Sequence, residues 1–308
     1  MATNSAERMG ERKRHSRLVD SLLRLVKEKP LGTVGLVITL LLLLTGIFAN
    51  FIAPHGMNAN NMRNILAPPS IHFWLGTDNL GRDLLSRAIY GARISVIVGL
   101  AATSLGTVFS TIIGLVSGYF GGMFDLIVQR FVDAVICIPM LMLVMIIMSM
   151  VGPGMLQLII VLGIYGGINT SRVIRSAVIG IKENMYLQAA EAIGCSNTRL
   201  LTKHVLPNIM APIIVGFTTY LPGVILTEAS LSFLGYGIPP PTPSWGGMLS
   251  ATGLEYMYLS PWMVIWPGLA LTITVYGVNI FGDSLRDILD PRLRGGIGRY
   301  GVKVKERS

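Results

Sequence analysis

The sequence contains a series of apolar runs, each about long enough to cross a lipid bilayer. The first run, LGTVGLVITLLLLLTGIFANFIA, covers residues 31–53. A membrane-spanning helix needs about 20 mainly apolar residues. Five further runs of this kind follow, at residues 94–119, 131–151, 155–171, 209–234 and 262–282. The sequence therefore predicts an all-α integral membrane protein with six transmembrane helices.

The composition agrees with this class. Of the 308 residues, 52% are hydrophobic and 13% are charged, whereas a soluble domain carries about 25% charged residues. A basic leader precedes the first run, but that run exceeds the roughly 7–15 apolar residues of a signal peptide, so we expect an uncleaved span. Cys137 and Cys195 lack the spacing of a disulfide framework or a metal site, and we expect both to be packing residues.

The basic residues lie beside the apolar spans, and their placement predicts the orientation of the chain. Much of the net charge of +9 comes from the tails, residues 1–30 and 285–308. Cytoplasmic segments of membrane proteins carry such an excess of Lys and Arg. An even number of spans puts both termini on one side, so we expect both to be cytoplasmic. The segment 54–93 then faces outward, as does 236–261, which contains no Lys or Arg.

Small side chains recur every four residues in the second span. They are Ala102, Gly106, Ser110, Gly114 and Gly118. At 3.6 residues per turn this spacing makes one slowly drifting stripe, and small stripes let helix backbones approach closely in lipid. We expect the stripe to pack against a helix of this chain or of a twin subunit. A pore lining is the alternative.

A water-soluble, helix-forming stretch separates the fourth and fifth spans. It reads LQAAEAIGCSNTRLLTKHVLPN, residues 187–208, within a loop at 181–208. Its first part is rich in residues that favour helix, and Gly194 can adopt the left-handed backbone of a helix end. Ser196 or Asn197 can cap a second short helix. The pattern predicts two short helices joined at a glycine bend. An amphipathic connector lying in the membrane interface is the alternative.

This stretch resembles the cytoplasmic loop of ABC importer permeases. Gln188-Ala-Ala is followed after three residues by Gly194 and, after nine more, by His204-Val-Leu-Pro. The family pattern has Glu in place of Gln188 and an apolar residue in place of His204. In the family this loop is a coupling helix that docks into a cleft on the ATPase subunit. The resemblance implies that the coupling residues here are Gln188, Ala189, Ala190, Glu191, Gly194, Arg199, Lys203, His204, Leu206 and Pro207.

Further stretches narrow the resemblance. Residues 74–95, 228–249 and 281–295 are similar to dipeptide/oligopeptide/nickel permeases of the second-permease, C-type branch. This implies a type I ABC importer permease bundle in a bacterial or archaeal cytoplasmic membrane, with a five-helix core at 94–284. It also implies ATP-driven import of peptides or a related solute by alternating access. Nickel or another small solute is the alternative cargo.

The same resemblance implies partners. They are a homologous second permease subunit, two ABC ATPase subunits, an extracytoplasmic solute-binding protein and the lipid bilayer. No Gly-Lys pair occurs in the sequence, so the phosphate-binding loop of an ATPase is missing. We therefore expect ATP and Mg on the ATPase subunits, and a transport subunit here that is not an enzyme and has no cofactor. The four His residues are too scattered for a metal cluster, and nucleic acid is not expected as a partner.

A carboxylate inside a membrane span is a functional candidate, because burying its charge is unfavourable. Asp133 lies near an inner span end, and Glu228 lies deeper in the fifth span. We favour a structural partner inside the bundle for Glu228 over contact with substrate. An ion-coupled secondary transporter, the alternative from a different class, would need more such groups and internal repeats. The sequence shows no clear repeat.

The outer segment carries a charged cluster, made of Asp78, Arg82, Asp83 and Arg87. One interpretation is local capping of a helix that starts at Asp78 or Asn79, with solvated ion pairs that stabilise little. The other is a surface that receives the binding protein, together with Trp245 in the second outer loop. The residues alone leave both interpretations open.

Overall fold

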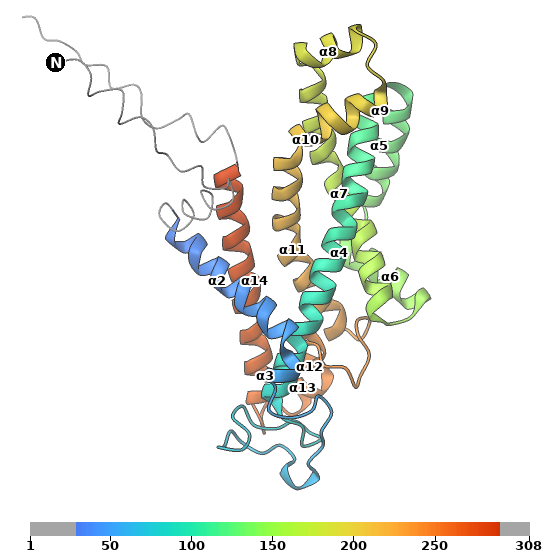
Figure 1. The fold of residues 1–308 in the computed structure, drawn as a ribbon. Coiled ribbons are helices and arrows are strands. Elements are labelled where there is room, and N and C mark those ends of the chain that lie inside the picture. Colours follow the sequence, from blue (N-terminus) through green and yellow to red (C-terminus); the bar gives the residue numbers. More distant parts are fainter. Residues whose placement is uncertain (1–28, 290–308) are drawn as a thin grey trace, which may run out of the picture.

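The computed structural model describes residues 29–289, and within that range every regular element is a helix (Figure 1). The tails expected at 1–30 and 285–308 lie largely outside the described residues. The long and medium helices are α2 Pro30–Ile47, α4 Leu84–Phe120, α5 Gly122–Ile136, α6 Met140–Val151, α7 Met155–Lys182, α8 Met185–Ala192, α11 Met210–Phe233 and α14 Trp262–Leu289. The short ones are α3 Ala49–Ile52, a 3₁₀ turn at Met62–Asn64, α9 Asn197–Arg199, a π-helical turn at Leu200–Val205, α10 Leu206–Asn208, α12 Trp245–Leu249 and α13 Ala251–Glu255.

Within residues 29–289, five helices are long and apolar enough to cross a membrane: α2, α4, α7, α11 and α14. A sixth crossing exists only if α5 and α6 count together, and these two are bent by 87°. The predicted span 131–151 is therefore wrong as a single helix. The helix breaks before Pro139, because proline has no N–H to donate and restricts the residue before it to extended backbone. Cys137, which we expected to pack, is exposed at this break.

Two spans are longer than predicted. α4 begins at Leu84 and not at residue 94, and α7 continues to Lys182, beyond residue 171. The first span is divided, because α2 ends at Ile47 and α3 follows Phe48. Hydrophobicity located these spans, but the polar residues that flank the apolar runs remain helical.

The stripe of small residues lies along the contact between α4 and α7. Its buried members are Ala102, Gly106, Ser110, Gly114 and Gly118. A Cβ on Gly114 would lie 2.7 Å from the Ser171 carbonyl oxygen, and one on Gly118 would lie 3.0 Å from the Arg175 carbonyl oxygen. Both distances are shorter than a normal contact, so these glycines allow the two backbones to approach.

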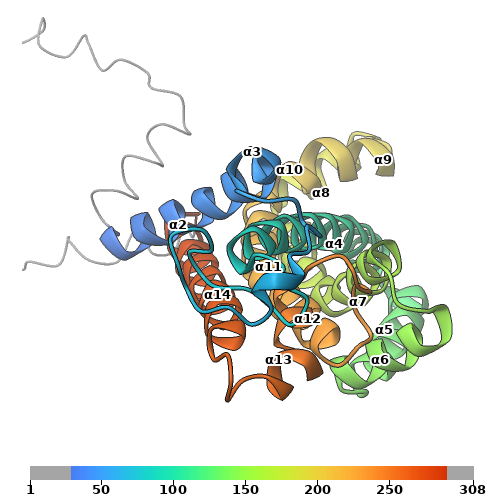
Figure 2. The ribbon, with the colours of Figure 1, turned by 90° about the horizontal axis from the view of Figure 1, so that it is seen from below.

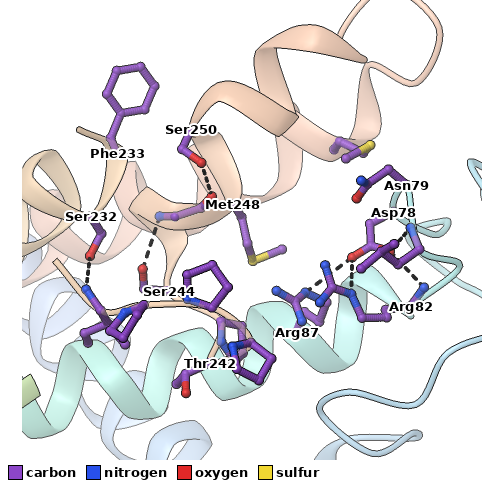
Figure 3. A pocket seen from close by; sticks show the side chains of 18 of the residues that line it. Asp78, Asn79, Arg82, Arg87, Ser232, Phe233, Thr242, Ser244, Met248 and Ser250 are labelled. Carbon is purple, nitrogen blue, oxygen red and sulfur yellow. Dashed lines mark hydrogen bonds and ion pairs between the residues drawn. The ribbon is translucent and has the colours of Figure 1, made fainter. Parts of the chain in front are cut away.

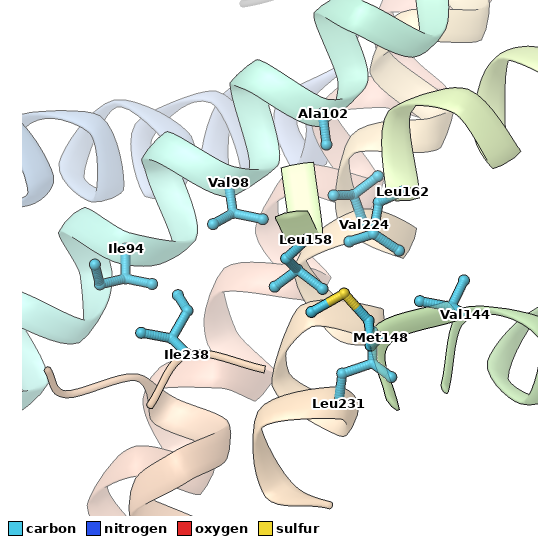
Figure 4. Packing of buried hydrophobic residues seen from close by; sticks show 10 residues of the cluster. All are labelled: Ile94, Val98, Ala102, Val144, Met148, Leu158, Leu162, Val224, Leu231 and Ile238. Atoms are coloured by element: carbon cyan, nitrogen blue, oxygen red, sulfur yellow. The ribbon is translucent and has the colours of Figure 1, made fainter. Parts of the chain in front are cut away.

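The buried core lies between α4, α6, α7 and α11, with Ile238 of the second outer loop added to it (Figure 4). A separate apolar cluster joins the ends of α4 and α7 to the loop that follows α7. Seen from below, α2 and α14 lie on one side of the bundle and α5 and α6 on the other (Figure 2). Large apolar side chains stay exposed along α2, α5 and α6, as is typical of helices that face lipid.

Candidate functional site

The loop between α7 and α11 contains a glycine bend. α8 ends at Ala192, and Gly194 follows with a φ of +83°. The Gly194 N–H donates to the Glu191 carbonyl at 2.9 Å, and the Cys195 N–H donates to the Ala190 carbonyl at 3.1 Å. These two bonds form a Schellman motif, which places glycine in the left-handed region. A Cβ at Gly194 would meet no atom within 4 Å, so the backbone conformation, and not crowding, favours glycine.

The second half of the loop differs from the predicted single short helix. One α-helical turn, Asn197–Arg199, is followed by the π-helical turn Leu200–Val205 and by α10. Ser196 occupies the N-cap position, although its side chain makes no capping bond. Pro207 lies in the first turn of α10, where a missing N–H costs little. The chain therefore continues in short helical pieces up to α11.

Apolar side chains fasten the loop to the core helices. Its inward side chains, each at most 3% exposed, are Leu187, Leu200, Val205 and Ile209. Their packing partners on α4 and α7 are Tyr119, Ile174 and Val178. Burial of a side chain of this size contributes about 1.5–3 kcal/mol relative to leaving it in water. The loop is therefore held firmly on the ends of α4 and α7.

Polar contacts centred on Tyr119 add to this attachment. Lys182 Nζ donates to the Tyr119 carbonyl oxygen at 2.7 Å and lies 5.5 Å from the centre of the Tyr119 ring. That carbonyl is at the C-terminal end of α4, where free carbonyls favour a cation. The Tyr119 hydroxyl donates to Asn197 Oδ1 at 3.1 Å. One aromatic residue thus links α4, α7 and α9.

The residues implicated in coupling lie mostly on the outward side of the loop. Those that are exposed are Gln188, Ala189, Glu191, Gly194, Arg199, Lys203 and Pro207. Those that are half-buried are Ala190, His204 and Leu206. Sequence reasoning missed Met185 and Ile193, which are 85% and 87% exposed on the same loop. An apolar residue in or next to a helix is normally assigned to a core, so their exposure could not be read from the sequence.

Glu228 on α11 is fully buried. Its Oε1 accepts a hydrogen bond from the Ser232 hydroxyl at 2.8 Å, and that hydroxyl accepts one from the Ile238 N–H at 3.3 Å. Glu228 Oε2 has no hydrogen-bond partner among the described residues. The side chain therefore has one partner inside the bundle. Between residues 29 and 289, no three His, Cys, Asp or Glu side chains are grouped as a metal site requires.

Asp83 of the outer charged cluster caps α4. Its Oδ2 accepts hydrogen bonds from the Ser86 N–H at 2.9 Å and from the Ser86 hydroxyl at 2.6 Å, which satisfies a free donor of the first turn. The helix start predicted at Asp78 or Asn79 is therefore wrong, and the helix begins at Leu84.

Asp78 closes the turn before α4. Its Oδ1 accepts hydrogen bonds from the Leu80 and Arg82 N–H groups, both at 2.9 Å. Its Oδ2 lies 2.6 Å from Arg82 Nε and 3.6 Å from Arg87 Nε (Figure 3). Asp78 and Arg87 are buried and Arg82 is half-buried. The cluster fastens the outer segment to α4 and exposes little charge.

Trp245 fastens the second outer loop to the same helix. It is buried, and its indole N–H donates to the Ala88 carbonyl at 3.0 Å. A Cβ on Gly91 would lie 2.8 Å from the Trp245 ring. Between the two outer segments lies a cavity of about 610 Å³, lined by Asp78, Arg82 and Arg87 of the charged cluster and by residues 239–243 (Figure 3).

Two family models match the sequence. Residues 110–295 match the model described as binding-protein-dependent transport system inner membrane component. Residues 16–69 match the N-terminal TM domain of oligopeptide transport permease C. The first match includes the loop between α7 and α11, and the second includes the first span.

Relatives align with most of the chain. The oligopeptide transport system permease protein OppC of Bacillus subtilis (strain 168) is 40% identical over 275 residues, covering 89% of this chain and 90% of the relative. The dipeptide transport system permease protein DppC of Alkalihalophilus pseudofirmus is 38% identical, covering 87% of this chain and 88% of the relative. The glutathione transport system permease protein GsiD of Escherichia coli O6:K15:H31 is 34% identical, covering 88% of this chain and 90% of the relative. On this similarity, the chain belongs to the family of binding-protein-dependent transport system inner membrane components.

Proposed function

We propose that this chain is the permease subunit of an ATP-driven ABC importer and moves peptides inward across a cytoplasmic membrane by alternating access. The observation that carries the proposal is the bent loop, which is exposed outward and fastened inward to the ends of α4 and α7. Force applied to the loop would act directly on these two closely packed helices. The peptide cargo is supported by relatives named for oligopeptide, dipeptide and glutathione transport.

The proposed partner at the loop is an ABC ATPase subunit, which supplies the ATP and Mg. Met185 and Ile193 offer it exposed apolar side chains, and exposed apolar groups rimmed by polar residues are typical of interaction sites. Arg199 and Lys203 are exposed on the following turns and can pair with carboxylates at the edge of such an interface. The complete importer would hold two ATPase subunits and a second, homologous permease.

The proposed partner at the outer segments is a solute-binding protein. Ile71 and Trp74 are 90% and 69% exposed there. Asp78, Arg87 and Trp245 lie buried within these segments and give the outer surface its shape. We therefore assign the contact to the exposed rim, with the charged cluster as its support.

Crosslinking in the assembled transporter tests the proposal. With Cys137 and Cys195 replaced by Ser, Ala189→Cys places one thiol on the exposed side of α8. A thiol-reactive photocrosslinker should then join this chain to a copurified ATPase subunit. The matched control is Met150→Cys, which is 81% exposed at the end of α6 and should give no ATPase adduct. The proposal fails if no ATPase copurifies with the chain, or if only Met150→Cys gives the adduct.

A further inference from the structure

α5 carries its polar side chains toward the bundle and its apolar ones away from it. Asp125, Gln129 and Asp133 recur every four residues and share one helix face. The opposite side chains, each more than half exposed, are Phe124, Ile127 and Phe131. In α5 only Val132 is buried. Burial of apolar surface therefore contributes little to the position of α5, and its polar contacts decide where it lies.

Asp125 is held by two neighbouring helices. Arg175 of α7 donates to it twice, from Nε to Oδ1 at 2.6 Å and from Nη2 to Oδ2. The Ser117 hydroxyl of α4 donates to Oδ1, and Gln129 Nε2 donates to that hydroxyl at 3.1 Å. A two-pronged contact between Arg and a carboxylate fixes direction as well as distance. The Asp125 and Arg175 side chains are 14% and 31% exposed, so the contact is partly shielded.

This contact lies close to the attachment of the loop. Ser117 and Tyr119 belong to the last turn of α4. Arg175 and Lys182 are about two turns apart on α7. Lys182 donates to the Tyr119 carbonyl, and the Tyr119 hydroxyl donates to Asn197 of the loop. Polar contacts therefore run from the loop, through the ends of α4 and α7, to α5.

We propose that Asp125 and Arg175 are positioning residues that transmit movement of the loop to the bent pair α5–α6. The inference rests on the proposed function, in which an ATPase moves the loop. Because α5 has little apolar contact with the bundle, it follows the helices that bind its carboxylate. α6 follows α5 across the 87° bend and packs into the core through Val144 and Met148, so a displacement of α5 reaches the core through α6.

A second ion pair between the same two helices provides a matched control. Asp133 of α5 pairs with Arg172 of α7, but their side chains are 42% and 44% exposed. Exposed ion pairs contribute little. Asp133→Asn therefore removes one carboxylate from the same face of α5 and leaves the Asp125 contact intact.

The test uses the complete transporter with its binding protein in proteoliposomes, and it measures ATP hydrolysis and uptake of radiolabelled trialanine. Asp125→Asn should lower uptake per ATP at least tenfold while ATP hydrolysis stays within twofold of the parent. Asp133→Asn should change neither quantity by more than twofold. Uptake per ATP that is unchanged in Asp125→Asn, or lowered equally in both variants, would overturn the inference. If Asp125→Asn does not assemble, Arg175→Lys tests the same contact, because Lys keeps the charge but cannot bind with two prongs.

A double variant tests whether Asp125 and Arg175 act through one shared contact. Residues that act as one contact give non-additive effects, so Asp125→Asn with Arg175→Gln should lower uptake per ATP no further than the worse single variant. Losses that multiply would mean that the residues act separately and would overturn the inference. A parent that copurifies with no ATPase would instead refute the proposed function.

Discussion

At the scale of single residues, glycine is required here for two different reasons. Gly114 on α4 faces the α7 backbone, where a Cβ would lie 2.7 Å from the Ser171 carbonyl oxygen. Gly194 has open space around it but a φ of +83°, and residues with a Cβ rarely adopt such a φ. The first glycine permits close packing, and the second permits a bend.

Gly114→Ala should lower the midpoint of thermal unfolding in detergent. The added methyl group would press on backbone atoms of α7, and overpacking of this kind costs about 1–3 kcal/mol. The control is Gly180→Ala on α7, where a Cβ would meet nothing within 4 Å. Alanine favours helix over glycine by about 0.8–1.0 kcal/mol, so the control midpoint should stay or rise. Equal midpoints for the two variants would show that α4 and α7 are not tightly packed at Gly114.

At the scale of elements, the same helix-ending motif occurs at both ends of the molecule. Gly194 follows the end of α8, and Gly235, with a φ of +86°, follows the end of α11. The Gly235 N–H donates to the Ser232 carbonyl at 3.2 Å, and the Tyr236 N–H donates to the Leu231 carbonyl at 2.8 Å. A Cβ added to either glycine would meet no atom within 4 Å. Replacing either glycine therefore strains the backbone in the same way. The two replacements differ only in which segment they deform.

Gly194→Val should lower both ATPase copurification and peptide uptake at least fivefold, because it deforms the loop that we propose as the docking element. A left-handed backbone costs an L-residue about 1–2 kcal/mol. Gly235→Val carries the same strain at the far end of the bundle and should retain ATPase copurification. Quantitative blotting of copurified ATPase measures the difference. Equal retention in both variants would exclude the bend from docking.

Local patterns predicted most elements, and their failures have physical causes. The apolar runs predicted α2, α4, α7, α11 and α14 because span length and hydrophobicity are properties of the run itself. The prediction for α7 stopped at residue 171 although the helix runs on to Lys182. Arg172 and Arg175 look like the end of a span, but they are paired with Asp133 and Asp125 of α5. Such partners cannot be identified from a single run.

At the scale of the whole molecule, contacts with α4 decide where the outer segment and the loop after α7 lie. The outer segment is fastened to the first turn of α4, where Asp83 bonds to Ser86, and the loop is fastened to the last turn, where Lys182 donates to the Tyr119 carbonyl. The two segments therefore lie at opposite ends of α4, and α7 runs parallel to α4. With α4 across the membrane, the pair α5–α6 returns the chain across it once, despite the bend of 87°.

Labelling with a membrane-impermeant maleimide tests this topology. In a background without Cys137 and Cys195, Trp74→Cys should react in right-side-out vesicles, since this residue is 69% exposed. Gln188→Cys, also exposed, should react only in inside-out vesicles or after permeabilisation. Reaction of both thiols from one side would mean that α4 does not hold these two segments on opposite sides of the bilayer.

Local sequence patterns were enough to predict the membrane class, five of the spans and the glycine bend of the loop. Hydrophobicity, helix length and the conformational freedom of glycine act over a few neighbouring residues, so a local pattern suffices for each. Two other contacts follow from the folded bundle: Trp245 is buried against Ala88, 157 positions away, and Arg175 binds Asp125, 50 positions away. A partner at such a separation is chosen by how helices pack, and packing is a property of the assembled bundle.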